Sequence, residues 1–177
     1  MATYRRSLVP GATYFFTVNT DKRQRILTHP EVIAALRTAF HSVKARYPFE
    51  IEASVLLPDH LHCIWTQPPE DARYSLRWNA IKRLVSQETR TLHSQNLGSL
   101  QRERRELGLW QRRFWEHQIR DESDFEKHVD YIHWNPVKHR YAVRILEWPY
   151  SSFHRYVKRG LLPRDWATGE IDGDFGE

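Results

Sequence analysis

Apolar residues recur along most of this chain with the period of either a strand or a helix. Segments that alternate in polarity, or that are rich in aromatic and β-branched residues, predict four strands over residues 14–19, 49–57, 60–66 and 114–120. Apolar residues three or four positions apart predict helices over residues 30–47 and 74–93. Pro58-Asp59 supplies turn chemistry, so we expect the second and third strands to pair antiparallel.

A third helix is predicted after the fourth strand. Ser123 and Glu126 fit a capping box at its start, and Asn135-Pro136 should end it or nearly end it. At about 100° per residue, one stripe of the helix is apolar and should be buried: Phe125, Val129 and Ile132. An adjacent flank, which we expect to be neither in the core nor fully exposed, carries His128, Tyr131 and Asn135.

The predicted order, β-α-β-β-α-β followed by a helix, is that of a ferredoxin-like split β-α-β unit. We therefore expect an α+β fold with an antiparallel sheet, an added helix that carries Tyr131, and an irregular C-terminal tail. The 177 residues suit one domain, which we place at residues 1–166, followed by a flexible acidic tail over residues 167–177. Residues 95–111 should form an exposed loop or a short helix.

The composition adds charge and location to this picture. The 27 Lys and Arg residues against 22 Asp and Glu residues give a formal charge of +5, which favours a polyanionic partner. Arg greatly outnumbers Lys, and its planar guanidinium suits phosphate or base recognition. Cys63 is the only cysteine, so no intramolecular disulfide can form, and no apolar stretch approaches the ~20 residues of a membrane span. We expect a cytosolic protein with no membrane partner.

A pair of histidines lies on the third predicted strand. Residues two apart on a strand point to the same face, so His60 and His62 should project together while Cys63 points the other way. Two neutral imidazoles side by side are good ligands for a divalent metal ion. Two histidines on a strand are also compatible with coincidence in a chain that has ten of them. The pair alone therefore leaves metal binding and a structural role both open.

The third helix brings a phenol and an amide to one turn of each other. Tyr131 and Asn135 are four residues apart, so their side chains should be neighbours. Asn135 can offer a carbonyl oxygen as a third metal ligand, which would put the metal beside the Tyr131 hydroxyl. A phenol is a poor nucleophile at neutral pH, and its attack on phosphate needs a nearby cation. The combination with the histidine pair favours a metal-assisted phosphoryl-transfer site.

These residues resemble the motifs of a known enzyme family. His60-Leu61-His62 looks like the HUH motif of single-strand DNA nucleases, in which a bulky apolar residue separates two histidines. The segment from Tyr131 to His139, with the sequence YIHWNPVKH, resembles the single-tyrosine motif of REP-associated tyrosine transposases. Supporting similarity occurs at residues 110–117 and 148–154, and the resemblance extends from about residue 4 to residue 166.

The resemblance implies an activity and the roles of four residues. It implies cleavage and rejoining of single-stranded DNA next to short palindromic REP hairpins, with a covalent 5′-phosphotyrosine intermediate and a requirement for Mg²⁺ or Mn²⁺. Tyr131 would be the nucleophile, with His60 and His62 as metal ligands. Asn135 would take the place that related insertion-sequence transposases give to a glutamine. The family leads us to expect a monomer that acts in cis, with a homodimer as the alternative, and gives no role to residues 94–108.

Basic and aromatic side chains near these motifs are candidates for contacts with DNA. Four are expected to hold phosphates: Arg112, Arg113, Lys138 and Arg140. Four aromatic residues are candidates for stacking on unpaired bases: Trp78, Trp134, Tyr150 and Phe153.

Two other functions share some of these features. A replication initiator or relaxase also carries a His-apolar-His motif, but usually with a third histidine and a larger domain. A domesticated protein would bind hairpins without cutting them. A zinc deaminase is disfavoured because the pair lacks the glutamate and the paired cysteines of that chemistry, and a zinc peptidase is disfavoured because HExxH is absent.

Overall fold

The computed structural model describes residues 7–93 and 108–166, and the expectations for residues 94–107 and 167–177 lie outside that range. The elements follow one another in the order β1 (Thr13–Asn19), η1 (Asp21–Arg23), α1 (Pro30–Arg46), β2 (Glu50–Leu56), β3 (His60–Thr66), α2 (Tyr74–Glu88), α3 (Arg90–His93), β4 (Trp115–Gln118), α5 (Glu122–Lys138), η3 (Ile145–Glu147) and α6 (Phe153–Lys158). The predicted β-α-β-β-α-β order with a following helix is confirmed.

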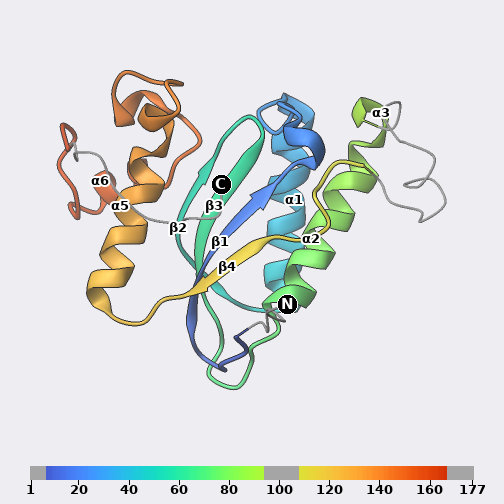
Figure 1. Cartoon of the computed structure of the whole chain (residues 1–177), viewed down its shortest axis with the longest axis horizontal. Coiled ribbons are helices and arrows are strands. Elements are labelled where there is room, and N and C mark those ends of the chain that lie inside the picture. The colour runs from blue at the N-terminus through green and yellow to red at the C-terminus, as the bar shows by residue number, and fades with distance from the viewer. Residues whose placement is uncertain (1–6, 94–107, 167–177) are drawn as a thin grey trace, which may run out of the picture.

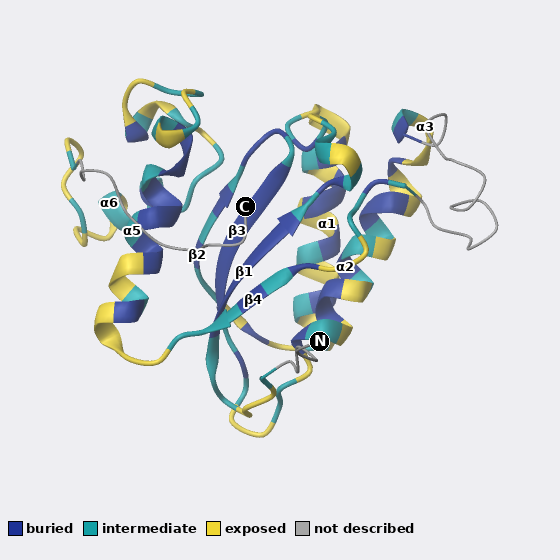
Figure 2. Ribbon diagram, in the orientation of Figure 1, coloured by how far each residue is buried: buried dark blue, intermediate teal, exposed yellow. Residues whose placement is uncertain are grey.

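The four strands form one sheet in the order β2-β3-β1-β4, and all neighbouring strands run antiparallel. This topology is the expected ferredoxin-like α+β arrangement. The helices α1 and α2 lie on one side of the sheet, whereas α5 covers the other side and α6 lies beyond it (Figure 1). Strands β1 and β3 are at the centre, so side chains on both of their faces are buried (Figure 2).

The face covered by α1 and α2 holds an aromatic core. Trp65 of β3 and Trp78 of α2 stack with their ring centroids 4.2 Å apart, and Phe49 packs 4.3 Å from Trp65. Trp78 is only 1% exposed. The expectation that Trp78 stacks on unpaired bases is therefore wrong, because its ring faces are already covered by protein.

Helix α5 begins two residues earlier and ends two residues later than its sequence signals suggest. Asp121, rather than Ser123, is the N-cap, and its carboxylate accepts a hydrogen bond of 2.8 Å from the backbone N–H of Asp124. Pro136 lies within the last turn and the helix continues to Lys138. A proline this close to the end removes one helical hydrogen bond without breaking the helix.

The chain after α5 folds back over α5 and along the edge of the sheet. Leu56 of β2 donates a backbone hydrogen bond of 2.9 Å to the carbonyl of Tyr150, which adds a short bridge at that edge. The fully buried His133 of α5 shares a hydrogen bond of 3.0 Å with the hydroxyl of Ser152. No helix among the described residues is both long and apolar enough to cross a membrane.

Candidate active site

His60 and His62 lie side by side on the face of the sheet that α5 covers. Antiparallel pairing places His62 opposite Thr17 and His60 opposite Asn19 of β1. Both imidazoles are fully buried, and their ring centroids are 4.9 Å apart with the ring planes 81° to each other. The prediction that they share one face of a strand is confirmed.

A hydrogen bond at Nδ1 orients each imidazole. Nδ1 of His62 lies 2.8 Å from the hydroxyl of Thr17, and Nδ1 of His60 donates to a carboxylate oxygen of Asp59 at 2.7 Å. Burial opposes ionisation of Asp59, but the His60 hydrogen bond and the charges of His60 and Arg23 outweigh it and lower its pKa. Such partners at one ring nitrogen are what fix a metal-binding histidine and direct its other nitrogen, Nε2, toward the metal.

Tyr131 of α5 packs against the same histidines. Its ring centroid is 5.3 Å from that of His62, and its side chain is fully buried. The expected partial exposure of the helix flank is wrong for all of its members: His128 is 5% exposed, and Tyr131 and Asn135 are 0% exposed. The flank is buried because it packs on the sheet: the rings of His128 and Tyr131 both lie against Phe15 of β1.

Lys138 contacts the phenol directly. Its Nζ donates a hydrogen bond of 2.9 Å to the Tyr131 hydroxyl and lies 4.8 Å from the centre of the ring. The two residues are seven apart, which is two helical turns, so α5 presents both on one side. An ammonium group at this distance stabilises negative charge on the phenol oxygen.

The last turns of α5 bring two more side chains to the site. Asn135 is fully buried one turn after Tyr131. His139, the C-cap residue of α5, lies with its ring centroid 5.2 Å from that of His60. The candidate site therefore combines two histidines from β3 with a phenol and an ammonium group from α5 and the imidazole of its C-cap residue, with the buried Asn135 one turn from the phenol.

Comparison with known proteins identifies the family that carries this arrangement. The family model "Transposase IS200 like" matches residues 9–135, which include His60, His62, Tyr131 and Asn135. The chain belongs to the IS200-like transposases. It is 45% identical over 178 residues to the REP-associated tyrosine transposase of Escherichia coli K12, covering 100% of this chain and 98% of that protein.

Two further relatives agree with this assignment. The "Putative REP-associated tyrosine transposase" of Haemophilus influenzae Rd is 44% identical over 181 residues, covering 99% of this chain and 100% of that protein. A solved REP-associated tyrosine transposase bound to a REP hairpin has a TM-score of 0.83 at 43% identity, and the match covers 100% of this chain and 98% of that chain. The resemblance stated from the motifs is confirmed, and the chain is a transposase of the REP-associated tyrosine group.

This transposase has a second cluster of potential metal ligands beside the site. Among the residues that the structure describes, His117, Asp124 and His128 place their ligand atoms within 4.8 Å of one another. However, Arg120 donates to the Asp124 carboxylate from its backbone N–H at 3.0 Å and from Nε at 3.3 Å, and His117 donates at 2.8 Å. Because a guanidinium already neutralises this carboxylate, we interpret the cluster as an ion-pair network that ties β4 to α5.

The environment of this network shifts the pKa values of Asp124 and His128. Burial disfavours the anion of Asp124, but hydrogen bonds from His117 and Arg120 outweigh that effect and lower its pKa to about 2. Burial lowers the pKa of His128, which favours its neutral form. Asp124 and His128 lie about two turns and one turn before Tyr131, so the network fixes the half of α5 that leads into the site.

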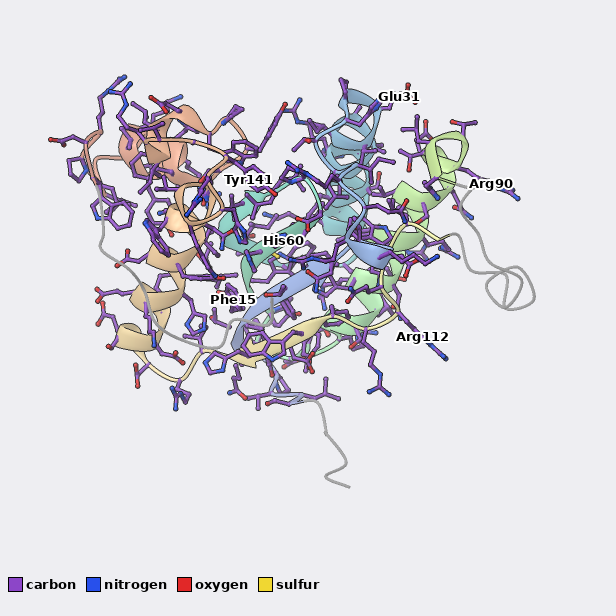
Figure 3. The ribbon with its side chains drawn as sticks, turned by 45° about the horizontal axis from the view of Figure 1, so that its top comes forward. Phe15, Glu31, His60, Arg90, Arg112 and Tyr141 are labelled. Atoms are coloured by element: carbon purple, nitrogen blue, oxygen red, sulfur yellow. The ribbon has the colours of Figure 1, made fainter. Side chains whose placement is uncertain are left out.

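The remaining predicted DNA contacts fall in different places. Arg112 and Arg113 are exposed before β4, and Figure 3 shows Arg112 on the side of α2, away from His60. Lys82 of α2 donates to the backbone carbonyls of Gln111 and Arg112, at 2.6 and 3.4 Å. Arg140 is exposed directly after α5.

The remaining aromatic residues expected to stack on bases differ in their exposure. Phe153 is fully buried against His133, whereas Trp134 and Tyr150 are partly exposed. Phe153 is therefore no platform for a base in this structure, because its ring belongs to the packing between α5 and α6.

Sequence reasoning missed three residues that shape the site. Thr17 and Asp59 orient the histidines, and His139 packs on His60. A signal existed for two of them: Asp59 directly precedes His60, and His139 follows Asn135 by one helical turn. Thr17 could be found only from the pairing register of β1 and β3.

Proposed function

We propose that this transposase cuts single-stranded DNA next to a REP-type hairpin through a covalent phosphotyrosine on Tyr131, with the help of a divalent metal ion, and can rejoin the strands. The observation that carries the proposal is the convergence of the His60–His62 pair with the Tyr131–Lys138 pair. Tyr131 packs 5.3 Å from His62, ring to ring, and Lys138 lies 2.9 Å from its hydroxyl. A hairpin partner is supported by the similar transposase that was solved bound to a REP hairpin.

The donor set fits a divalent ion, for which we propose Mg²⁺ or Mn²⁺. His60 and His62 would hold it through Nε2, because Nδ1 of each ring is engaged by Asp59 or Thr17. The carboxamide oxygen of Asn135 would be the third ligand. None of these three ligands is charged, so a bound ion would keep its full positive charge to offset that of the scissile phosphate.

Tyr131 would supply the nucleophile. Its oxygen attacks phosphorus, the bond to the 3′ oxygen breaks, and a 3′-hydroxyl is released. Lys138 would stabilise the charge that develops on the phenol oxygen before attack. The tyrosyl phosphodiester conserves the energy of the broken bond, so a 3′-hydroxyl can reverse the step without ATP.

The proposal is tested with a hairpin oligonucleotide that carries single-stranded flanks. In Mn²⁺ the wild-type protein should give a cleaved product and a DNA–protein adduct that survives denaturation, and EDTA should abolish both. Tyr131→Phe should bind the hairpin with unchanged affinity and give neither product. Cleavage by Tyr131→Phe would exclude the phosphotyrosine mechanism, whereas hairpin binding without any metal-dependent cleavage would indicate a domesticated binding protein.

Substitution of Lys138 distinguishes two possible roles of this residue, stabilisation of the phenolate during cleavage and contact with a DNA phosphate. If it stabilises the phenolate, Lys138→Met should lower the single-turnover cleavage rate at saturating protein by roughly 10- to 100-fold. The hairpin affinity should stay within about twofold, and the rate should keep rising at pH values where the wild-type rate has levelled off. Lys138→Arg should restore part of the rate. A loss of affinity with an unchanged rate at saturation would instead support the phosphate contact expected from the sequence.

A further inference from the structure

A row of aromatic rings leads outward from His60. The His139 ring is 5.2 Å from His60, Tyr141 lies 6.0 Å beyond His139, and Trp148 lies 5.6 Å beyond Tyr141. The last two steps are stacked, with interplanar angles of 21° and 29°. Figure 3 shows Tyr141 between the segment that follows α5 and the sheet, on the side where His60 lies. We call His139, Tyr141 and Trp148 the aromatic row.

An arginine from the opposite loop covers the middle of this row. The guanidinium carbon of Arg25 lies 5.3 Å from the centre of the Tyr141 ring. Arg25 is exposed and Tyr141 is partly exposed, so the side chain that covers the ring is free to move into solvent. An aromatic face with a guanidinium above it is a site that suits a flat, electron-rich ring such as a nucleobase.

The two loops that build this pair are held in an unusual backbone conformation. Within residues 7–93 and 108–166, the non-glycine residues with positive φ are Lys22, Arg23 and Arg140, at 51°, 55° and 59°. All three are basic, and they lie in the loops that carry Arg25 and Tyr141. A left-handed conformation disfavours residues with a Cβ, and such residues cluster at functional sites.

Each loop also has an anchor that connects it to the site. Tyr141 and Arg140 donate backbone hydrogen bonds of 2.9 and 3.0 Å to the carbonyls of Pro136 and Val137, a Schellman motif that turns Tyr141 back toward His139. On the other loop, Nε of Arg23 lies 3.0 Å from the carboxylate of Asp59, the same side chain that orients His60. The aromatic row is thus built into the metal-binding end of the site.

We propose that an unpaired base of the DNA strand next to the scissile phosphate stacks on the face of Tyr141 that Arg25 covers here, and that the exposed Arg25 side chain moves outward to cover the other face of that base. This inference rests on the proposed function and names the substrate group that this part of the site takes. The base must be unpaired, because a base within a duplex has both faces covered by its neighbours. Arg140 and Lys22 are exposed in the loops that carry Tyr141 and Arg25, so they are candidates for contacts with backbone phosphates of the same strand.

The experiment uses a hairpin oligonucleotide in which 2-aminopurine replaces one base at a time along the single-stranded flanks. The protein carries Tyr131→Phe, so that the DNA stays intact in Mn²⁺. We expect strong quenching of fluorescence at one position beside the cleavage site. Adding Tyr141→Ala should remove that quenching and weaken binding about tenfold, Tyr141→Phe should retain both, and Arg25→Ala should reduce both to an intermediate extent.

Tyr47 provides a matched control. The guanidinium of Arg46 lies 5.3 Å from the centre of the Tyr47 ring, but this pair is at the C-terminal end of α1, at the end of the sheet opposite His60. Tyr47→Ala should leave quenching and affinity unchanged. Thermal unfolding of each variant shows whether it is folded, and Arg25→Ala, which changes an exposed side chain, keeps the test valid if Tyr141→Ala unfolds.

The outcomes distinguish this inference from the proposed function. If no flank position is quenched, or if Tyr141→Ala and Arg25→Ala bind and quench like their parent, the base-binding role of Tyr141 is wrong even though the wild type cleaves. If the wild type forms no adduct while the quenching depends on Tyr141, the base site stands and the cleavage mechanism is wrong.

Discussion

The two faces of the sheet are built from the same strands and both have an apolar cluster, but the side chains of β3 differ between them. On β3, Leu61, Cys63 and Trp65 point toward α1 and α2, whereas His60 and His62 point toward α5. All five are buried, at 5% exposure or less. Residue alternation on one strand therefore separates an apolar face from the face that carries the candidate site.

The two faces differ in how the free-energy cost of burying their side chains is offset. On the α1 and α2 face, apolar rings gain free energy simply by leaving water. On the α5 face, polar groups are buried, and burial of a polar group is tolerated only with a hydrogen-bond partner. Thr17 for His62, Asp59 for His60 and Ser152 for His133 supply such partners. Oriented, dehydrated polar groups are what catalysis requires.

Neighbouring residues on β3 give the sharpest test of this comparison. We expect His62→Ala to lower metal-dependent cleavage by at least about 10³-fold, because a candidate ligand is lost. Cys63→Ala should leave cleavage within about twofold and cost about 1 kcal/mol of stability, because it removes only a buried sulfur. Single-turnover cleavage and urea unfolding of both variants measure the two effects. Equal loss of activity in both would show that the faces are not functionally separate.

The aromatic face should respond in stability rather than in chemistry. Trp78→Ala removes a ring that stacks 4.2 Å from Trp65 and is 1% exposed, so it should reduce the free energy of unfolding by about 3–4 kcal/mol. Urea unfolding at 20 °C measures the loss, and the cleavage rate per folded molecule should be unchanged. A loss below about 1 kcal/mol together with weaker DNA binding would restore the base-stacking role first expected for Trp78.

The sequence predicted the sheet side of the site well and the helix side less completely. Alternation alone placed His60 and His62 together, because a strand has only two faces. A helix has a continuous circumference, and the period of α5 could not show that His128 and Tyr131 would pack on the sheet together with the apolar stripe. Similarly, the spacing of Lys138 from Tyr131 was visible, but their hydrogen bond depends on how the side chains are confined.

Long-range partners were the least predictable part. Thr17 lies 45 residues before His62, and their contact follows from strand register, which no local pattern of either segment specifies. Trp78 was misjudged because a tryptophan on an amphipathic helix serves equally well as a core residue or as a base platform. Only the packing of α2 on the sheet decides between these roles.

Low pH should destabilise the packing of α5 on the sheet, because it protonates Asp124. An aspartate in an unfolded chain titrates near 3.9, and the folded pKa is about 2. Because the folded value is the lower one, the stabilisation is complete above about pH 5 and is lost as the pH falls from 4 toward 2, by roughly 2 kcal/mol. Urea unfolding between pH 2.5 and 6 should show this slope in the wild type and a shallower one in Asp124→Asn. If stability changes with pH equally in both proteins, the contacts from His117 and Arg120 do not lower the pKa of the Asp124 carboxyl group.

The smallest expected effect is that of Arg140→Gly, which tests whether the loop after α5 is less stable than it could be because its side chain binds DNA. Arg140 occupies the left-handed position of a Schellman motif, where glycine is usual, with φ of 59°. Arg140→Gly should relieve the strain and raise the free energy of unfolding by roughly 0.5–1 kcal/mol, since the strain outweighs the extra freedom of glycine when unfolded. The same change should weaken hairpin binding and reduce its salt dependence by about 0.7 in the log–log slope, the amount for one single-strand phosphate contact.

A variant that is more stable and binds equally well would leave the arginine without a reason to occupy this strained position. A stabilised variant with weaker, less salt-dependent binding would show that the loop is strained because its side chain meets DNA.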